Sequence, residues 1–150
     1  MNTFLTGRLV NNFSFAEMTN KDNPSGPALR IDTPEAIDHL IMMQELREWA
    51  FKYYPTVFRN GLRVSSWYRT PEYNALPWVK GAVNSAHLDC RATDIDNIPQ
   101  AYYGVFVDAW KVICSIHGRV GGCELYSWGM HFDSYSDKFG VTTFRLKDNR

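Results

Sequence analysis

The distribution of helix and strand signals along the chain limits the possible fold most strongly. Two long segments have the apolar spacing of helices, residues 34–53 and residues 98–118, whereas the segments with strand-like alternation are short. Thr33 can cap the first helix and Pro34 suits its first position. Helices and short antiparallel strands in separate blocks are typical of α+β domains. We therefore predict an α+β fold with helices packed on a small antiparallel sheet.

The apolar residues of the two segments predict which helix faces are buried. In the first helix this face consists of Ile37, Leu40, Ile41, Gln44 and Trp49. In the second it consists of Val107, Trp110, Val112, Ile113 and Cys114, and Gly118 provides a stop. The two histidines of these segments, His39 and His117, are interpreted as structural, with His117 placed to cap carbonyl groups at the end of its helix.

Four segments have strand character. "GLRVSSWYRT" at 61–70 alternates apolar and polar residues before the turn-like "TPEYN", and "ATDI" at 92–95 can form a short strand. "GGCELYSWGMHFDSY" at 121–135 predicts two short strands joined around Ser127, Trp128 and Gly129. "KFGVTTFRL" at 138–146 predicts an edge or terminal strand.

A chain of 150 residues without repeats or composition breaks predicts one domain covering residues 1–150. Residues 1–33 form an arm or loop in this interpretation, because a turn-rich segment at 19–35 lies too near the start to separate two domains. The 16 basic and 16 acidic residues balance, so the chain has no global positive field for nucleic acid or an anionic membrane. We expect neither partner.

The start of the chain lacks the basic start, continuous apolar run and small-residue cleavage site of a signal peptide, so we expect a cytoplasmic product when made. No segment approaches the roughly 20 apolar residues of a membrane-spanning helix. The three cysteines, Cys90, Cys114 and Cys123, form no CxxC pair and predict buried thiols in a reducing compartment.

The polar stretch "SAHLDCRATDI" contains the residues best suited to chemistry. His87 and Asp94 are seven residues apart, a spacing that neither one helix nor one strand can bring onto one small ion. The chain must therefore bend between them, and "LDCR" can supply the bend. A catalytic zinc site commonly has three nitrogen or oxygen ligands, and His131 is the best third candidate.

Strand alternation in "GMHFDSY" places His131, Asp133 and Tyr135 on one face and Met130 and Phe132 on the other, packed face. From spacing alone, hydrogen-bonded structural histidines remain the alternative to metal ligands.

An ordered set of motifs along most of the chain resembles a known zinc peptidase family. The motifs are "SSWYRTPEYN", "GAVNSAHLDCRATDI", an apolar helix, "GRVGG" and "WGMHFDSY". The family includes D-alanyl-D-alanine carboxypeptidases and phage L-alanyl-D-glutamate peptidases, and its pattern is matched at Ser85, His87, Ala92, Asp94 and His131. The openings "FSFAEMT" and "RIDTPEAIDHL" resemble the phage-type members. The resemblance implies the Hedgehog/DD-peptidase fold.

The resemblance also implies roles for individual residues. His87, Asp94 and His131 would bind Zn²⁺, and Arg69 would hold a carboxylate or the scissile carbonyl oxygen of a peptide substrate. Ser85 would bond the substrate or orient a ligand. Considered alone, Arg69 is better suited to a surface salt bridge, and only the set of motifs favours the substrate-binding role.

Two residues depart from the family's pattern. Cys90 stands at a glycine position, and a positive φ there would cost on the order of 1 kcal/mol or more. A Cys90 thiolate near the metal, or a thiol enzyme using it, is the alternative interpretation. Trp128 stands where many members have an acidic residue, so the proton acceptor must lie elsewhere.

Glu124 and Asp133 are the candidate catalytic carboxylates. A hairpin loop of two or four residues would place Glu124 opposite His131 on the same face, whereas a three-residue loop would turn it away unless a bulge intervened. Asp133 shares that face in any case and could instead orient a zinc-binding histidine. We favour Glu124 as the base and Asp133 as the orienting residue; exposed carboxylates without a catalytic role are the alternative for both.

The resulting prediction is a zinc-dependent peptidase that cleaves stem or cross-link peptides of peptidoglycan. It would act at the bacterial cell wall after holin release or as part of a virion. Nearby aromatic residues could line its groove or belong to the core: Trp67, Tyr68, Trp78, Tyr126 and Trp128. The alternative is a non-catalytic virion or tail module that retains the fold. The sequence leaves the oligomeric state open.

Overall fold

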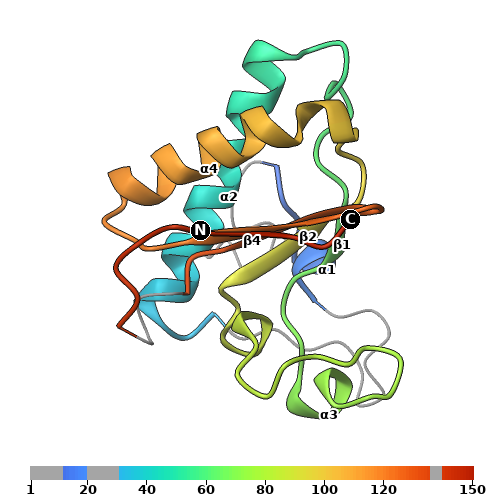
Figure 1. Cartoon of the computed structure of the whole chain (residues 1–150), viewed down its shortest axis with the longest axis vertical. Helices are drawn as coiled ribbons and strands as arrows, with labels where there is room; N and C mark the ends of the chain where they lie inside the picture. The colour runs from blue at the N-terminus through green and yellow to red at the C-terminus, as the bar shows by residue number, and fades with distance from the viewer. Residues whose placement is uncertain (1–11, 20–30, 136–139) are drawn as a thin grey trace.

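A five-stranded mixed sheet forms the centre of the described chain, which comprises residues 12–19, 31–135 and 140–150 of the computed structural model (Figure 1). The strands are β1 (Val64–Ser66), β2 (Ala92–Ile95), β3 (Gly122–Tyr126), β4 (Gly129–Asp133) and β5 (Arg145–Asp148). Their order is β1-β2-β4-β3-β5. The predicted α+β class is confirmed.

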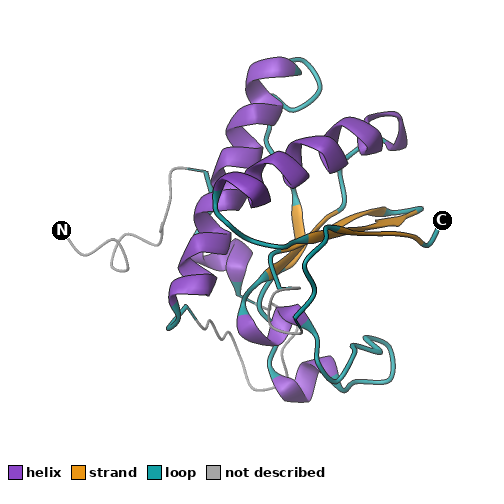
Figure 2. Cartoon of the chain, turned by 60° about the vertical axis from the view of Figure 1, so that its left-hand side comes forward, coloured by secondary structure: helices purple, strands orange, loops and turns teal. Residues whose placement is uncertain are grey.

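The helices are α1 (Phe15–Met18), α2 (Pro34–Tyr53), α3 (Pro71–Asn74) and α4 (Tyr103–Ile116), with 3-10 turns η2 (Ala86–Asp89) and η3 (Gln100–Tyr102). In Figure 1 the sheet is nearly edge-on, with α4 on one side and α3 on the other, and Figure 2 shows the same arrangement after a turn. The predicted helix at 34–53 is confirmed, and the Thr33 side chain accepts a hydrogen bond from Ala36 N as its N-cap.

The prediction of a purely antiparallel sheet was wrong at β5. Three pairings are antiparallel, but β5 runs parallel to β3, with Glu124 opposite Lys147. Because β4 already pairs with both β2 and β3, the returning chain can add only at an open edge, and it adds beside β3. The predicted terminal strand is therefore an edge strand, but it begins only at Arg145.

Alternation along the strands separates a helix-covered face from a polar face. Met130 and Phe132 on β4 are fully buried, as predicted, and Phe132 packs against Trp110 of α4 at 5.6 Å between ring centroids. Thr93 on β2 bonds to His39 of α2 at 3.0 Å between Oγ1 and Nε2. Asp94 follows Thr93 on β2, and His131 lies between Met130 and Phe132 on β4. Because side chains alternate along a strand, Asp94 and His131 point to the other face.

The predicted helix faces were partly wrong. Leu40 and Gln44 of α2 and Trp110, Ile113 and Cys114 of α4 are buried, but Ile37, Ile41 and Val112 are 47%, 42% and 57% exposed. On α4 the buried stripe passes through Phe106, Trp110 and Ile113, and Val112 lies about 200° around the helix from Trp110. On α2 the stripe includes Met43 and Leu46, which the sequence pattern did not single out.

The two structural histidines lie outside the polar face. His39 is fully buried between Trp67 and Trp110, and burial lowers its pKa to about 3. His117 ends α4, but its ring contacts Asp38 and Glu45 of α2 instead of capping carbonyl groups.

The first 33 residues, predicted to be an arm or loop, include α1, while residues 1–11 and 20–30 lie outside the described part. Phe13 and Met18 of this region are buried in the core. All three cysteines are described; they are buried and form no disulfide, as predicted. Among the described helices, none has both the length and the apolar character needed to cross a membrane.

Candidate metal centre

The bend predicted between His87 and Asp94 is formed by η2 and a left-handed residue. Ser85 caps η2, and its Oγ accepts a hydrogen bond from His87 N at 3.3 Å. Cys90 ends the turn with φ 57° and ψ 32°, so the cost expected for a side chain in the left-handed conformation applies, about 1–2 kcal/mol. The chain then reverses into β2, which brings Asp94 back towards His87.

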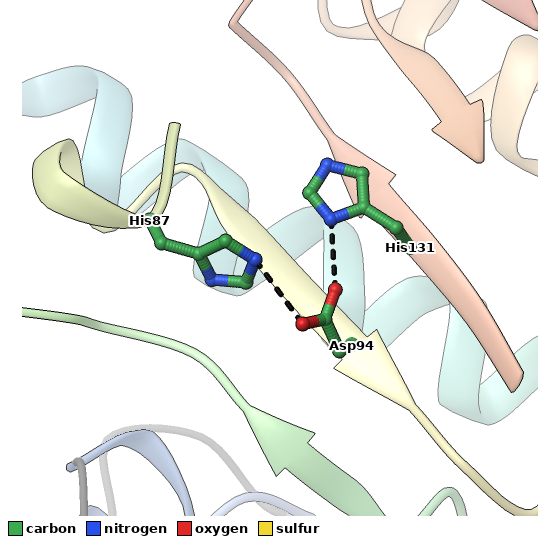
Figure 3. Close-up of side chains that lie close together, drawn as sticks. All are labelled: His87, Asp94 and His131. Carbon is green, nitrogen blue, oxygen red and sulfur yellow. Dashed lines mark hydrogen bonds and ion pairs between the residues drawn. The ribbon is translucent and has the colours of Figure 1, made fainter. Parts of the chain in front are cut away.

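His87, Asp94 and His131 converge, as Figure 3 shows, from η2, β2 and β4. His87 Nε2 lies 3.3 Å from Asp94 Oδ2, and His131 Nδ1 lies 2.8 Å from Asp94 Oδ1. One possible ligand atom from each residue lies within 4.8 Å of the others. These three side chains could therefore hold a metal ion.

The second nitrogen of each imidazole already has an acceptor. His87 Nδ1 lies 2.5 Å from the carbonyl oxygen of Trp67, and His131 Nε2 lies 3.3 Å from Asp133 Oδ2. A nitrogen that donates a proton to such an acceptor leaves the opposite ring nitrogen as the lone-pair donor. In each histidine this opposite nitrogen is the one that faces Asp94, so the donor set fits a metal ion.

The charges around the three side chains favour a proton on His131. Burial opposes ionisation of Asp94, but His87 and His131 lower its pKa well below the usual value. Burial lowers the pKa of His87. Burial also disfavours protonation of His131, yet its hydrogen bonds to Asp133 and Asp94 raise its pKa to about 10. A metal ion would therefore have to displace the His131 proton.

Arg69 and Ser85 both border the site. Arg69 Nη2 donates to Asp94 Oδ2 at 2.8 Å, and its Nε donates to Ser66 Oγ at 2.9 Å. The guanidinium is therefore fixed beside a candidate ligand instead of on the open surface. Ser85 lines the same cleft in addition to capping η2.

Glu124 lies directly opposite His131 in the β3–β4 hairpin, because only Ser127 and Trp128 separate the paired residues Tyr126 and Gly129. This confirms the register predicted for a two-residue loop. Burial raises the pKa of Glu124, but the Tyr126 hydroxyl, His131 and other neighbours lower it overall, so the side chain is ionised at neutral pH. Asp133 is fully buried beside His131 and also accepts from Arg145 Nη2 at 2.5 Å.

Apart from the buried Asp133, these candidate site residues border a cleft of about 410 Å³. Its lining contains the three candidate ligands together with Arg69, Ser85, Glu124, Tyr126, Trp128, Lys80 and Lys147. A larger cavity of about 590 Å³ lies between α2 and α4, but its lining is mainly apolar and contains no histidine. We therefore place the candidate site in the smaller cleft.

The structure also adjusts the set of site residues. Cys90 is buried in the hydrophobic core and is not in the candidate ligand group of the described residues, so nothing here favours a thiolate ligand. Lys147 was missed because it reaches the site through the parallel pairing of two distant segments. The Trp67 carbonyl was missed because a backbone acceptor leaves no signal in the sequence. Of the aromatic residues predicted to line the groove or belong to the core, Tyr126 and Trp128 line the cleft and Trp67 belongs to the core.

In comparisons with protein-family models, curated proteins and solved structures, no match to this chain is found.

Proposed function

We propose that this chain is a zinc-dependent peptidase that cleaves stem or cross-link peptides of bacterial peptidoglycan. The proposal includes the Hedgehog/DD-peptidase fold, of which the α+β class is the coarser description. It rests on the motif resemblance for the substrate and on the cleft for the chemistry.

The observation that carries the proposal is a row of three side chains across neighbouring strands. Glu124 on β3 is opposite His131 on β4, and His131 is opposite Asp94 on β2. Directly opposed side chains have Cβ atoms about 4.5–5.5 Å apart. A candidate base and two candidate ligands therefore lie side by side on one face, and His87 joins them from η2.

Each residue has a role in the proposed hydrolysis. His87, Asp94 and His131 would hold the ion, which when bound would act as a Lewis acid on the amide carbonyl and lower the pKa of water. Glu124 accepts a proton from the attacking water and returns it to the leaving amine. Arg69 presents N–H donors to a substrate carboxylate or carbonyl oxygen, and Asp133 keeps His131 in the required tautomer.

A second candidate function follows from Trp128, which replaces the acidic residue of many family members. A non-catalytic virion or tail module could retain the fold and the metal without hydrolysis.

For the enzyme, the expected setting is the cell wall, reached after holin release or as part of a virion.

Metal analysis combined with mass spectrometry of purified muropeptides tests the proposal. We expect one zinc per chain and new peptide termini after incubation. Glu124→Gln should retain the zinc and reduce turnover by roughly 10²–10⁴-fold. Full zinc loading without any cleavage would favour the binding module, whereas unchanged turnover in Glu124→Gln would reject this residue as the base.

A further inference from the structure

The two carboxylate oxygens of Glu124 have different surroundings. Oε2 accepts hydrogen bonds from Tyr126 Oη at 2.6 Å and from Asn149 Nδ2 at 3.1 Å. Lys147 Nζ also lies nearest this oxygen, at 3.9 Å. Within the described residues, no hydrogen bond or ion pair is found for Oε1. One oxygen is therefore anchored by the protein, and the other is left for a partner in the cleft.

The Tyr126 ring is held in place by its neighbour Trp128. The Tyr126 ring stacks on Trp128, with centroids 4.9 Å apart and an interplanar angle of 17°. A ring fixed in this way has few alternative orientations, so its hydroxyl is a preorganised donor to Glu124.

The second donor comes from the end of the chain. Asn149 N donates to Leu125 O at 2.8 Å, which extends the β3–β5 pairing past Asp148. This backbone bond places the Asn149 amide beside Glu124. The bond from Asn149 is longer than that from Tyr126 and lies at the exposed surface, so we rank Tyr126 as the main anchor.

We propose that Tyr126, assisted by Asn149, is a positioning residue that anchors Oε2 of Glu124 and thereby makes Oε1 the proton-accepting oxygen. This inference rests on the proposed function, because it assigns a role within that reaction. An unanchored glutamate samples several rotamers, whereas a base must lie within hydrogen-bond reach of the proton that it removes. The stacked rings of Tyr126 and Trp128 at the end of the hairpin thus hold in position a base that lies on β3.

Kinetics of the zinc-loaded protein on purified muropeptides test this role. We expect Tyr126→Phe to lower kcat by roughly 10–100-fold with little change in KM, because the ring is retained and only the position of the base is lost. In a Glu124→Gln background the same change should have no further effect, since the two residues act as one unit. Asn149→Ala should give a smaller loss. Independent, multiplicative losses for Tyr126 and Glu124 would overturn the proposal.

Tyr103→Phe is the matched control. It removes another tyrosine hydroxyl that bonds to the same strand but not to the carboxylate, so kcat should remain near the wild-type value. An equal loss in this variant would attribute the effect of Tyr126 to general loosening of the hairpin and would reject the positioning role.

Crystal structures of the zinc-loaded wild type and Tyr126→Phe give a result that does not depend on activity. We expect one Glu124 position in the wild type and a displaced or divided carboxylate in the variant. An unmoved carboxylate would overturn the proposal even if turnover fell. If the carboxylate moves but the loaded wild type cleaves no muropeptide, the anchoring contact stands, and both the catalytic role and the proposed function are rejected.

Discussion

The contact between Asp133 and His131 predicts a pH-dependent effect of Asp133→Asn on zinc affinity. Asp133 Oδ2 lies 3.3 Å from His131 Nε2, and the Asp133 side chain is fully buried. Acceptors of this kind typically contribute about 10–100-fold to metal affinity. Asparagine has nearly the same shape, so the substitution removes the charge with little change in packing. At high pH we therefore expect the variant to bind zinc about 10–100-fold more weakly.

Protonation of His131 opposes this loss at lower pH. Burial disfavours the charged ring, but its hydrogen bonds to Asp133 and Asp94 raise its pKa in the metal-free protein to about 10. Below that pKa each unit of falling pH costs the wild type about tenfold in apparent affinity, because one proton must be displaced. Asp133→Asn lowers the pKa of His131 and so reduces this competition. The ratio of wild-type to variant affinity should therefore increase as pH rises.

Isothermal titration calorimetry with a competing chelator can measure this ratio across neutral and alkaline pH. Buffers of different ionisation enthalpy report the protons released, and we expect about one per zinc for the wild type near neutral pH and fewer for the variant. Glu124→Gln is the control, because it removes a carboxylate that also lies opposite His131 but contacts neither nitrogen of its ring. A ratio that stays constant or falls with rising pH would refute the role assigned to Asp133.

Three further predictions concern stability. In urea unfolding, Cys90→Gly should be more stable than Cys90→Ala by about 1 kcal/mol, because alanine retains the left-handed strain. Cys114 is the control: it lies within α4, so Cys114→Ala should be more stable than Cys114→Gly by about 1 kcal/mol. Burial opposes protonation of His117, but two α2 carboxylates raise its pKa, so the free energy of unfolding should fall as pH rises from about 6.5 through that raised value. Urea unfolding across this range should show a smaller fall for His117→Gln. Zinc at about 100 times its Kd should stabilise the wild type by about 2.7 kcal/mol, measurable as a Tm increase that a chelator reverses and that His87→Ala lacks.

Elements with a strong local signal could be predicted from the sequence. The helix at 34–53 has its cap and its proline at adjacent positions. Strand alternation gave the hairpin register for each loop length, but only the structure shows that the loop has two residues. His87 and Asp94 required one further step, the bend between them. That bend could be inferred because no regular element brings residues seven apart onto one ion.

Features that depend on distant segments could not be predicted in this way. The parallel pairing of β5 with β3 arises because β4 ends at Asp133, opposite Gly122, and β5 begins at Arg145, opposite the same residue. The exposure of Ile37 and Val112 follows from how α2 and α4 pack, which apolar spacing alone does not specify. The contacts of Asn149 and Lys147 with Glu124 result from the β5 pairing and could not be predicted without it.

Many members of the family that the motifs resemble have an acidic residue where this chain has Trp128, and the proposed hydrolysis is compatible with this difference because of where the hairpin turns. Trp128 lies in the two-residue loop, whereas Glu124 and Asp94 flank His131 within the paired strands. Backbone pairing fixes the positions of Glu124, His131 and Asp94, so a change of side chain in the loop leaves this row intact. The ring of Trp128 instead stacks on Tyr126, whose hydroxyl contacts Glu124. In the proposed reaction a base on β3 therefore requires no acid in the loop, and Trp128 would stabilise Tyr126, the proposed positioning residue.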